Sequence, residues 1–392
     1  MPFDFDQFID RAGTNTVKYD LRKAIFSNGD VIPMWVADMD FSVPPFVLEA
    51  VRKRAEHPIY GYTIIPDSYY SALIDWQKKR HGWELKKDRI FYSPGVVTGL
   101  NMIVQAFTAP GDKIIVQPPV YFPFFSCVSN NGRTLVQNQL LERNGYYSID
   151  FEDLERKMKD GAKLLILCNP HNPVSRCWTR EELEWIGAKS LEHGVLVVSD
   201  EIHCDLVFDP HRHIPFATLS EEIAARTITC IAPSKTFNLA GLFTSSIIIT
   251  DDTLRVIFKK QEERLHLSPN IFGISAAEAA YREGDAWLEE LKSYLLQNYK
   301  VLKDFLAANM PEVTASELEA TYLLWLDFRN WHLPADKLKN MLIEKAGIGL
   351  VDGRQFGHGG EGFHRMNIGC PKATVLNALD RIFSLRKTIG IY

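Results

Sequence analysis

The sequence predicts an α/β protein: a large domain with a mostly parallel sheet between helices, then a smaller α+β domain. Between about residues 90 and 250, short runs rich in β-branched residues alternate with helical patterns. That alternation is typical of a parallel sheet covered by helices. A long amphipathic pattern over residues 285–310 ends the alternation and marks the start of the smaller domain.

The expected strands of the large domain are Ile90–Tyr92, Lys113–Val116, Thr134–Val136, Lys163–Leu167, Val195–Ser199, Thr227–Ile231 and Ser245–Thr250. Helices are expected at Val97–Thr108 and Thr179–His193. Thr179, with Glu182 three residues later, is a typical helix start.

After the long helix, Thr321–Asp327 is expected to form a strand and Ala335–Ala346 a helix. The first 45 residues lack the alternating pattern, so we expect residues 1–45 to join the small domain and cover the site. Residues 46–284 would then form the large domain and residues 285–392 the small one.

Composition excludes several classes of partner. Of the 392 residues, 46% are hydrophobic and 24% charged, as in ordinary globular proteins. The net charge of −5 gives no electrostatic case for binding nucleic acid or an anionic membrane. No apolar stretch approaches the roughly 20 residues needed to span a bilayer, and the acidic start lacks the apolar core of a signal peptide. We therefore expect a cytoplasmic protein.

The six cysteines are scattered and form no Cys-x-x-Cys pair. Several lie in apolar runs, which favours buried free thiols in a reducing compartment over disulfides. The histidine-containing segments His203-Cys204 and His211-Arg212-His213 have no matching second pair of ligands. No metal site is expected.

Three polar side chains follow three of the predicted strands. Asn172, Asp200 and Lys235 each come at or soon after the end of an apolar run. Because parallel sheets bind ligands beyond the carboxyl ends of their strands, these side chains should meet at one site. Pyridoxal 5′-phosphate needs a lysine for a Schiff base and a carboxylate for its pyridinium nitrogen. The sequence therefore predicts a pyridoxal-phosphate site with Lys235 and Asp200 as catalytic residues.

Each of these residues also has a simpler explanation. Lys235 could be solvated after its strand, Asp200 could cap a following helix, and Asn172 could serve a turn set by two Asn-Pro steps. Otherwise Asn172 would donate to the 3′-oxygen of the cofactor. His203 could bind that oxygen or hold Asp200, or be a satisfied core histidine. Ser234, beside Lys235, offers a hydroxyl to a phosphate, which favours the cofactor site.

Further cues are weaker when taken singly. Ser93–Leu100 runs from a strand into a helix through a glycine, and such a turn presents helix N–H groups to a phosphate, although turn chemistry alone explains it equally well. Tyr121 could stack on a flat ring or lie in the core. Arg365 interrupts a strand-like run, and its guanidinium suits a substrate carboxylate. A surface salt bridge is the alternative for Arg365.

Together these residues resemble the fold type I pyridoxal-phosphate enzymes of the aspartate aminotransferase superfamily. Four segments are similar, more narrowly, to its MalY/PatB-type cystathionine β-lyase branch: Met34–Phe41, Asn169–Pro173, Ser199–His203 and Ala232–Asn238. The resemblance runs over nearly the whole chain and implies a homodimer with shared active sites.

The resemblance also implies a role for each site residue. Lys235 would carry the cofactor, Asp200 would pair with the ring nitrogen, and Asn172 would bind the 3′-oxygen. The remaining implied contacts are ring stacking by Tyr121, phosphate binding by the backbone of Val96 and Val97 and the hydroxyl of Ser234, phosphate binding in the partner subunit by Tyr62, and substrate carboxylate binding by Arg365 and the backbone of Ala37.

Two positions depart from the family pattern. Eight residues after the lysine, many members carry a basic phosphate ligand, whereas this chain has Phe243. Many relatives also have glycine where this chain has Ser175, so the turn after Asn172 must form without it.

The implied activity is a carbon–sulfur β-lyase that cleaves L-cystathionine, cysteine or related S-substituted cysteines to a thiol, pyruvate and ammonia. An aminotransferase shares every step up to removal of the Cα proton, and the spacing of residues does not separate the two enzymes. A binding protein with a vestigial site is a third alternative, because a fold can outlive its chemistry. The complete set of Lys235, Asp200, Asn172 and Arg365 argues against the third.

Overall fold

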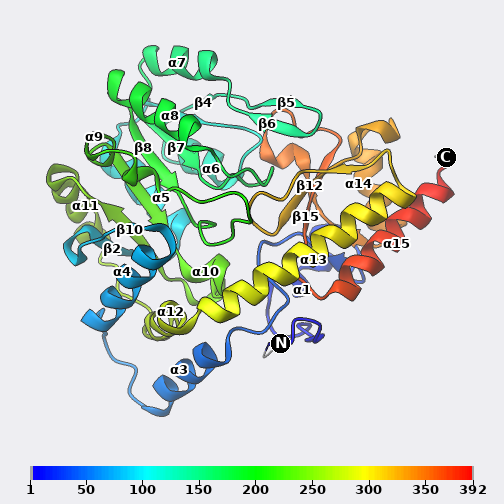
Figure 1. Ribbon diagram of the computed structural model, residues 1–392, viewed down its shortest axis with the longest axis horizontal. Helices are drawn as coiled ribbons and strands as arrows, with labels where there is room; N and C mark the ends of the chain where they lie inside the picture. The colour runs from blue at the N-terminus through cyan, green and yellow to red at the C-terminus, as the bar shows by residue number, and fades with distance from the viewer. Residues whose placement is uncertain (1–2, 391–392) are drawn as a thin grey trace.

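The computed structural model describes residues 3–390 and is built on a seven-stranded central sheet (Figure 1). Its strand order is β2-β10-β9-β8-β7-β3-β4. The strands are β2 (Ile90–Ser93), β3 (Lys113–Val116), β4 (Thr134–Gln137), β7 (Leu164–Cys168), β8 (Leu196–Asp200), β9 (Thr227–Ile231) and β10 (Ser245–Ile249). All seven predicted strands are confirmed to within two residues at each end. The sheet is parallel except at β10, which runs antiparallel to both of its neighbours.

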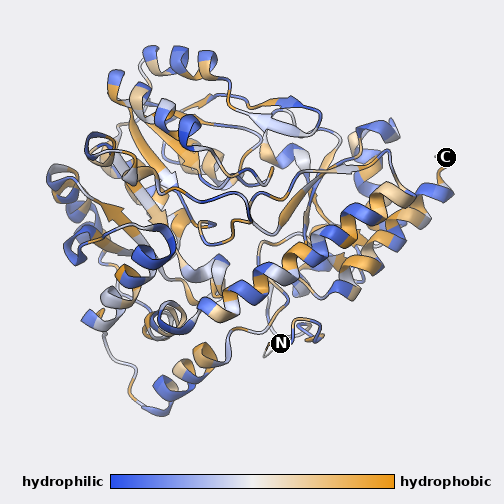
Figure 2. Cartoon of the chain, in the orientation of Figure 1, coloured by the Kyte–Doolittle hydropathy of each residue, from blue (hydrophilic) through white to orange (hydrophobic). Residues whose placement is uncertain are grey.

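Helices cover both faces of this sheet because its strands are apolar on both sides. Ile114 and Val116 of β3 pack into one core, with α5 (Val96–Phe107), α6 (Pro123–Ser129) and α11 (Asp252–Leu265). Ile115 points to the other face, where α7 (Phe151–Lys159) and α8 (Arg180–Glu192) pack. The helix start predicted at Thr179 is confirmed, because Thr179 and Glu182 form a reciprocal capping box. The apolar strands stand out in Figure 2.

The second, smaller sheet has the order β11-β12-β15-β14. Its strands are β11 (Thr314–Ala315), β12 (Leu323–Asp327), β14 (Val351–Asp352) and β15 (Phe363–Asn367). The long helix α13 (Asp285–Asn309) and the last helix α15 (Lys372–Thr388) lie side by side along it (Figure 1). The predicted strand, helix α14 (Ala335–Glu344) and long helix of this region are confirmed.

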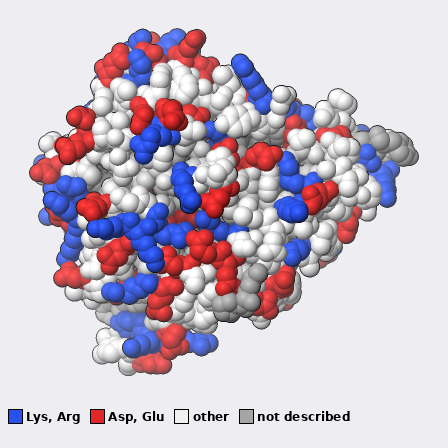
Figure 3. All heavy atoms as spheres, in the orientation of Figure 1, with Lys and Arg blue, Asp and Glu red and all other residues white. Residues whose placement is uncertain are grey.

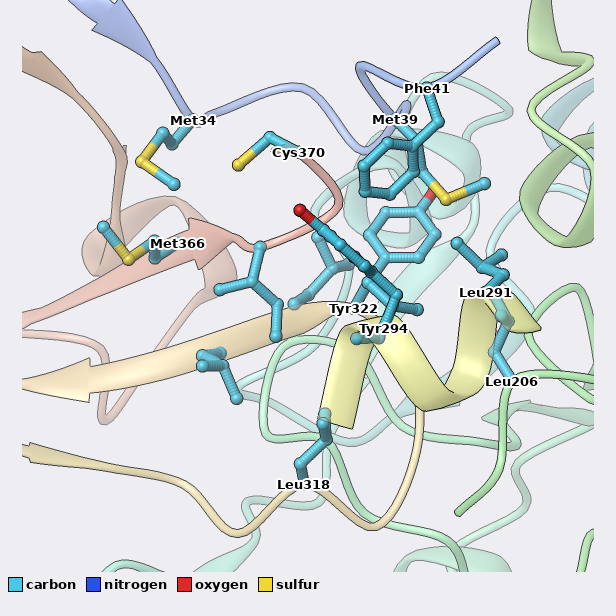
Figure 4. Close-up of a cluster of buried hydrophobic side chains, with 14 of the residues drawn as sticks. Met34, Met39, Phe41, Leu206, Leu291, Tyr294, Leu318, Tyr322, Met366 and Cys370 are labelled. Atoms are coloured by element: carbon cyan, nitrogen blue, oxygen red, sulfur yellow. The ribbon is translucent and has the colours of Figure 1, made fainter. Parts of the chain in front are cut away.

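The amino-terminal segment pairs with this smaller part of the molecule. β1 (Ile32–Pro33) forms a parallel bridge to β13 (Ile348–Gly349). Just after β1, Met34 and Met39 pack in one buried cluster with Tyr294 of α13 and with Tyr322 and Met366 of the small-sheet region (Figure 4). The entry segment, defined here as Met34–Phe41, is therefore held against the small sheet.

The remaining helices and the small hairpin flank the two sheets and connect them. They are α1 (Val17–Asp20), α2 (Arg22–Phe26), α3 (Pro45–Glu56), α4 (Asp67–His81), α9 (Glu221–Ala224), α10 (Pro233–Thr236), α12 (Ile271–Glu283) and the hairpin of β5 (Leu141–Arg143) and β6 (Tyr146–Ser148). α12 packs against α3 and α4, and the loop between α3 and α4 extends away from the body in Figure 1.

Surface and cysteine features agree with the composition. Positive and negative side chains are intermixed on the face shown in Figure 3. Within residues 3–390, no helix is long and apolar enough to cross a membrane. The six cysteines are all free and buried, as the sequence predicts.

Candidate active site

A cavity of about 270 Å³ lies where β7, β8 and β9 end and the entry segment passes over them. Nine of the residues singled out from the sequence line it: Ala37, Val96, Val97, Tyr121, Asn172, Asp200, His203, Ser234 and Lys235. The three polar residues that follow strands therefore do meet at one site. They meet because β7, β8 and β9 are parallel neighbours whose carboxyl ends share one edge of the sheet.

Lys235 is carried by the one-turn helix α10, directly after β9. Its Nζ donates to the carbonyl oxygen of Ala37 at 2.7 Å. Burial lowers the pKa of Lys235 to about 8, against the opposing effect of the carboxylates of Asp38 and Asp200. The explanation of a solvated lysine is therefore wrong, and a neutral amine becomes accessible near physiological pH.

Asp200 is the last residue of β8 and is 4% exposed. One carboxylate oxygen accepts a hydrogen bond from the N–H of Ile202 at 3.2 Å. No helix follows directly, so the helix-cap explanation is wrong: the chain continues in turns. Burial raises the pKa of Asp200 to about 7, against the effects of the Ile202 N–H and the Lys235 amine. A cation brought to this carboxylate would restore its ionised form.

Arg365 lies on β15, outside the cavity lining, and binds Asn172, which is part of that lining. Its Nη1 donates to Oδ1 of Asn172 at 3.0 Å, and its Nη2 donates to the carbonyl oxygen of Trp35 at 2.8 Å. The side chain is buried, and among the described residues it pairs with no carboxylate, so the surface salt bridge is wrong. Because Asn172 accepts through its oxygen, its amide nitrogen is left to donate into the cavity.

One end of the cavity is shaped to receive an anion. Gly95, with φ at +108°, precedes α5, and no side chain caps this helix. The first N–H groups of a helix have no partners inside it, so those of Val96 and Val97 can bind a phosphate. The hydroxyl of Ser234 lies on the same cavity wall. Among the described lining residues, Lys235 is the only cation, and Phe243 stands 60% exposed at the rim.

The two departures from the family pattern have different outcomes. Phe243 brings no charge to the anion end of the cavity, so backbone N–H groups and hydroxyls must bind the phosphate there. Ser175 takes the glycine's place by adopting a left-handed φ of +61°. Its hydroxyl donates to the carbonyl of Leu323, which ties the strained turn to the small sheet.

The aromatic and imidazole groups complete the walls. Tyr121 lines the cavity and does not belong wholly to the core. His203 is buried and its Nδ1 has no hydrogen-bond partner, so the explanation of a satisfied core histidine is wrong. Burial lowers the pKa of His203 well below its ordinary range, which favours a neutral ring that donates from one nitrogen and accepts at the other.

Tyr62 is not brought to the cavity of its own chain. It lies in the loop between α3 and α4, where its side chain is fully exposed, beside the exposed Ile59, Tyr60 and Ile64. The sequence reasoning also missed Tyr322, whose hydroxyl donates to the same Ala37 oxygen as Lys235, at 2.9 Å. Nothing in the apolar run around Tyr322 marks that hydroxyl, because only the folded chain brings the entry segment to it.

Pyridoxal phosphate fits the groups that the cavity leaves unpaired. Among the described residues, nothing bonds the second carboxylate oxygen of Asp200, the amide nitrogen of Asn172 or the hydroxyl of Ser234. The cofactor offers a ring nitrogen, a 3′-oxygen and a phosphate, and an aldehyde for the Lys235 amine. Donors and acceptors are thus complementary.

Comparison with known proteins gives the same assignment. The family model described as aminotransferase class I and II matches residues 29–382. Cystathionine beta-lyase PatB of Bacillus subtilis is 48% identical over 97% of this chain and 98% of its own length. Protein MalY of Escherichia coli is 31% identical over 95% of each chain.

The crystal structure of cystalysin from Treponema denticola, which contains pyridoxal 5′-phosphate, superposes with a TM-score of 0.97. It is 37% identical and covers all of both chains. These matches span the whole of both parts of the fold and not a single motif. This chain therefore belongs to the class I and II aminotransferase family of pyridoxal-phosphate-dependent proteins, in the branch that contains PatB and MalY.

Proposed function

We propose that this protein is a pyridoxal-phosphate-dependent carbon–sulfur β-lyase that cleaves L-cystathionine and related S-substituted cysteines. The observation that carries the proposal is a half-buried amine and a buried carboxylate, those of Lys235 and Asp200, in one cavity of a chain 48% identical to a cystathionine beta-lyase. Cystathionine and water would give homocysteine, pyruvate and ammonia, and cysteine would give sulfide in place of homocysteine.

When bound, pyridoxal phosphate withdraws electrons from the Cα–H bond of an attached amino acid. In this proposal Lys235 would hold the cofactor, and its Nζ would take the Cα proton of the substrate. A pKa of about 8 leaves part of the amine neutral near pH 7, as this step requires. Asp200 holds the proton on the ring nitrogen, which needs an ionised carboxylate at this buried position.

The substrate carboxylate would be held by the Arg365 guanidinium and the N–H of Ala37. That N–H has no acceptor among the described residues, and its carbonyl is fixed by two donors, Lys235 and Tyr322. Once the Cα proton is removed, the Cβ–S bond breaks and the sulfur leaves as a thiolate. Thiolate is a much better leaving group than hydroxide, so serine should be a poor substrate.

The lining of the cavity disfavours dicarboxylic amino acids. Apart from Lys235, its described lining residues include no cation, and Arg365 is assigned to the α-carboxylate. A side-chain carboxylate would therefore meet no partner, which is costly in a buried site. This argues against aspartate as the substrate of the alternative activity, an aminotransferase.

We also propose a homodimer in the cytoplasm. The loop that carries Tyr62 exposes four large apolar side chains, which a second copy could cover. Tyr62 would then reach the anion end of the partner's cavity and add a hydroxyl donor where Phe243 brings no charge. Six free buried thiols suit a reducing compartment.

The decisive experiment incubates the purified protein with L-cystathionine and measures pyruvate and free thiol. Equal amounts of both, without transfer of the amino group to an added 2-oxo acid, support the lyase. Amino transfer to 2-oxo acids with no pyruvate from cystathionine would assign the protein to the aminotransferases instead.

A further inference from the structure

Behind the cavity lies a buried chain of hydrogen bonds that the proposed chemistry does not use. Its centre is Asp205, five residues after Asp200, with a side chain 3% exposed. One oxygen of Asp205 accepts from Nε2 of His81 at 2.9 Å and from Nε1 of Trp76 at 3.1 Å. The other oxygen accepts from the hydroxyl of Thr236 at 2.8 Å. Three donors thus fix the carboxylate.

A second histidine–carboxylate pair lies beside the first. Nε2 of His213 is 2.9 Å from one oxygen of Glu201, whose other oxygen accepts from Ser199 and from the N–H of Phe216. The rings of His81 and His213 meet edge to face, with centroids 5.2 Å apart. Glu201 directly follows Asp200, which lines the cavity, so the second pair lies next to the proposed cofactor site.

Buried ionisable pairs are an expensive way to stabilise a fold, because well-packed apolar side chains often serve as well or better. The energetic cost of these buried pairs suggests that they are needed to orient a neighbouring group. Three donors on Asp205 leave it one arrangement, whereas an apolar contact would leave the groups free to shift.

The group that Asp205 orients is next to the reactive amine. Thr236 follows Lys235 and is fully buried on α10, a helix of four residues that has no side-chain cap at its amino end. A helix of one turn has little stability of its own, so its placement depends on tertiary contacts. The Thr236 hydroxyl bond is the side-chain hydrogen bond that fixes this turn to the chain after β8.

We propose that Asp205, held by His81 and Trp76, is a positioning residue that sets the place of Lys235 through the hydroxyl of Thr236. The inference rests on the proposed role of Lys235 and adds a residue that controls the position of this lysine. Neither Asp205 nor Thr236 lines the cavity, so they act on the reaction through the lysine.

Other charged and titratable groups face Asp205 and bear on any readout that depends on pH. Arg80 and His81 face it from α4 and Tyr281 from α12, while Cys204 is its chain neighbour. The test variant must therefore delete an uncharged group and leave all of these titratable side chains in place. Replacing Thr236 by valine does so, because it deletes one hydroxyl and keeps the branched shape.

The experiment uses the cofactor-loaded enzyme in four forms: wild type, Thr236→Val, Thr236→Ser and Thr229→Val. Thr229 is the matched control, because it is buried on β9 and its hydroxyl has no partner. Three properties are measured: the pH midpoint of the visible absorbance of the lysine-linked cofactor, kcat and KM for pyruvate release, and the thermal unfolding temperature.

We expect Thr236→Val to shift the absorbance midpoint and to lower kcat about tenfold, with KM changed by less than about twofold. Thr236→Ser should restore both properties, and Thr229→Val should match the wild type. A Thr236→Val enzyme that melts earlier but keeps the wild-type midpoint and kcat would show that the bond is merely structural and overturn the proposal.

If Thr236→Val does not fold, Trp76→Phe tests the chain by deleting another neutral donor to Asp205. The same midpoint shift and loss of kcat are expected, and unchanged values would overturn the proposal. The test is separable from the proposed function. A wild-type enzyme that forms no pyruvate would refute the lyase activity, whereas the absorbance comparison would still decide the role of Thr236.

Discussion

Replacing Asp200 by alanine tests whether this carboxylate holds the charge of the cofactor ring. Burial raises its pKa from an ordinary 3.8 to about 7, a difference of about three pH units. At 1.36 kcal/mol per unit, the site as a whole disfavours the ionised form by about 4 kcal/mol, with burial as the largest cause. A ring cation must supply at least that much to keep the carboxylate ionised well below pH 7. Removing a preorganised group that stabilises charge in a transition state typically costs about 3–4 kcal/mol, so losing this carboxylate should slow the reaction roughly a thousandfold.

The assay measures exchange of the substrate Cα proton with deuterated water and release of pyruvate, in wild type and Asp200→Ala. Both rates should fall about a thousandfold. A cofactor analogue with a methyl group on its ring nitrogen, and so a permanent positive charge, should restore part of the loss in the variant. Because Asp200 caps no helix, a variant within threefold of the wild-type rate would leave it without a role and refute the reasoning.

Four further outcomes are expected. Lys235→Ala should lose the covalent adduct that borohydride traps, and an unchanged adduct mass would remove Lys235 from its assigned role. Arg365→Leu should cost about 2–5 kcal/mol in kcat/KM and keep the cofactor; loss of cofactor with normal substrate kinetics would reassign this arginine. Tyr62→Phe should weaken cofactor binding. Mixing this variant with Lys235→Ala should yield hybrid dimers that each have one intact site. A protein that sediments as a monomer would contradict the shared site. Cα-proton removal should slow as the pH falls below about 8, because protonated Lys235 cannot accept a proton; a flat profile from pH 6 to 9 would contradict the assignment.

Apolar runs predicted the strands well because buried parallel strands are continuously apolar, and the polar residue that ends each run marks the ligand edge of the sheet. For that reason Asn172, Asp200 and Lys235 were found together in one cavity. The sequence of a strand does not indicate whether the strand runs parallel or antiparallel to its neighbours. The apolar run of β10 reads the same in either direction, and its antiparallel pairing with β2 and β9 emerges only from the chain connections.

Contacts between distant segments were equally invisible in the sequence. Asp38 gives no signal of its own, yet Arg11 binds it through two nitrogens, at 2.8 and 3.0 Å, 27 positions earlier in the chain. Asn238 accepts from the N–H of Met39 and donates to its carbonyl, each at 2.9 Å. These contacts hold the entry segment over Lys235, and they depend on the small sheet and the large domain meeting in one particular way.

Burial shifts the ionisation of two cavity groups in the directions that the proposed chemistry needs. Burial acts in opposite directions on these two groups, raising the pKa of Asp200 to about 7 and lowering that of Lys235 to about 8. Near neutral pH Asp200 is therefore partly protonated, and Lys235 has a neutral fraction although most of it stays protonated. Asp200 would become ionised when it holds a cationic ring, and the neutral fraction of Lys235 would supply the reactive amine. Pairs of titratable groups with shifts of this kind mark acid and base roles, and here one physical cause, exclusion of water by the entry segment and the strand ends, accounts for both.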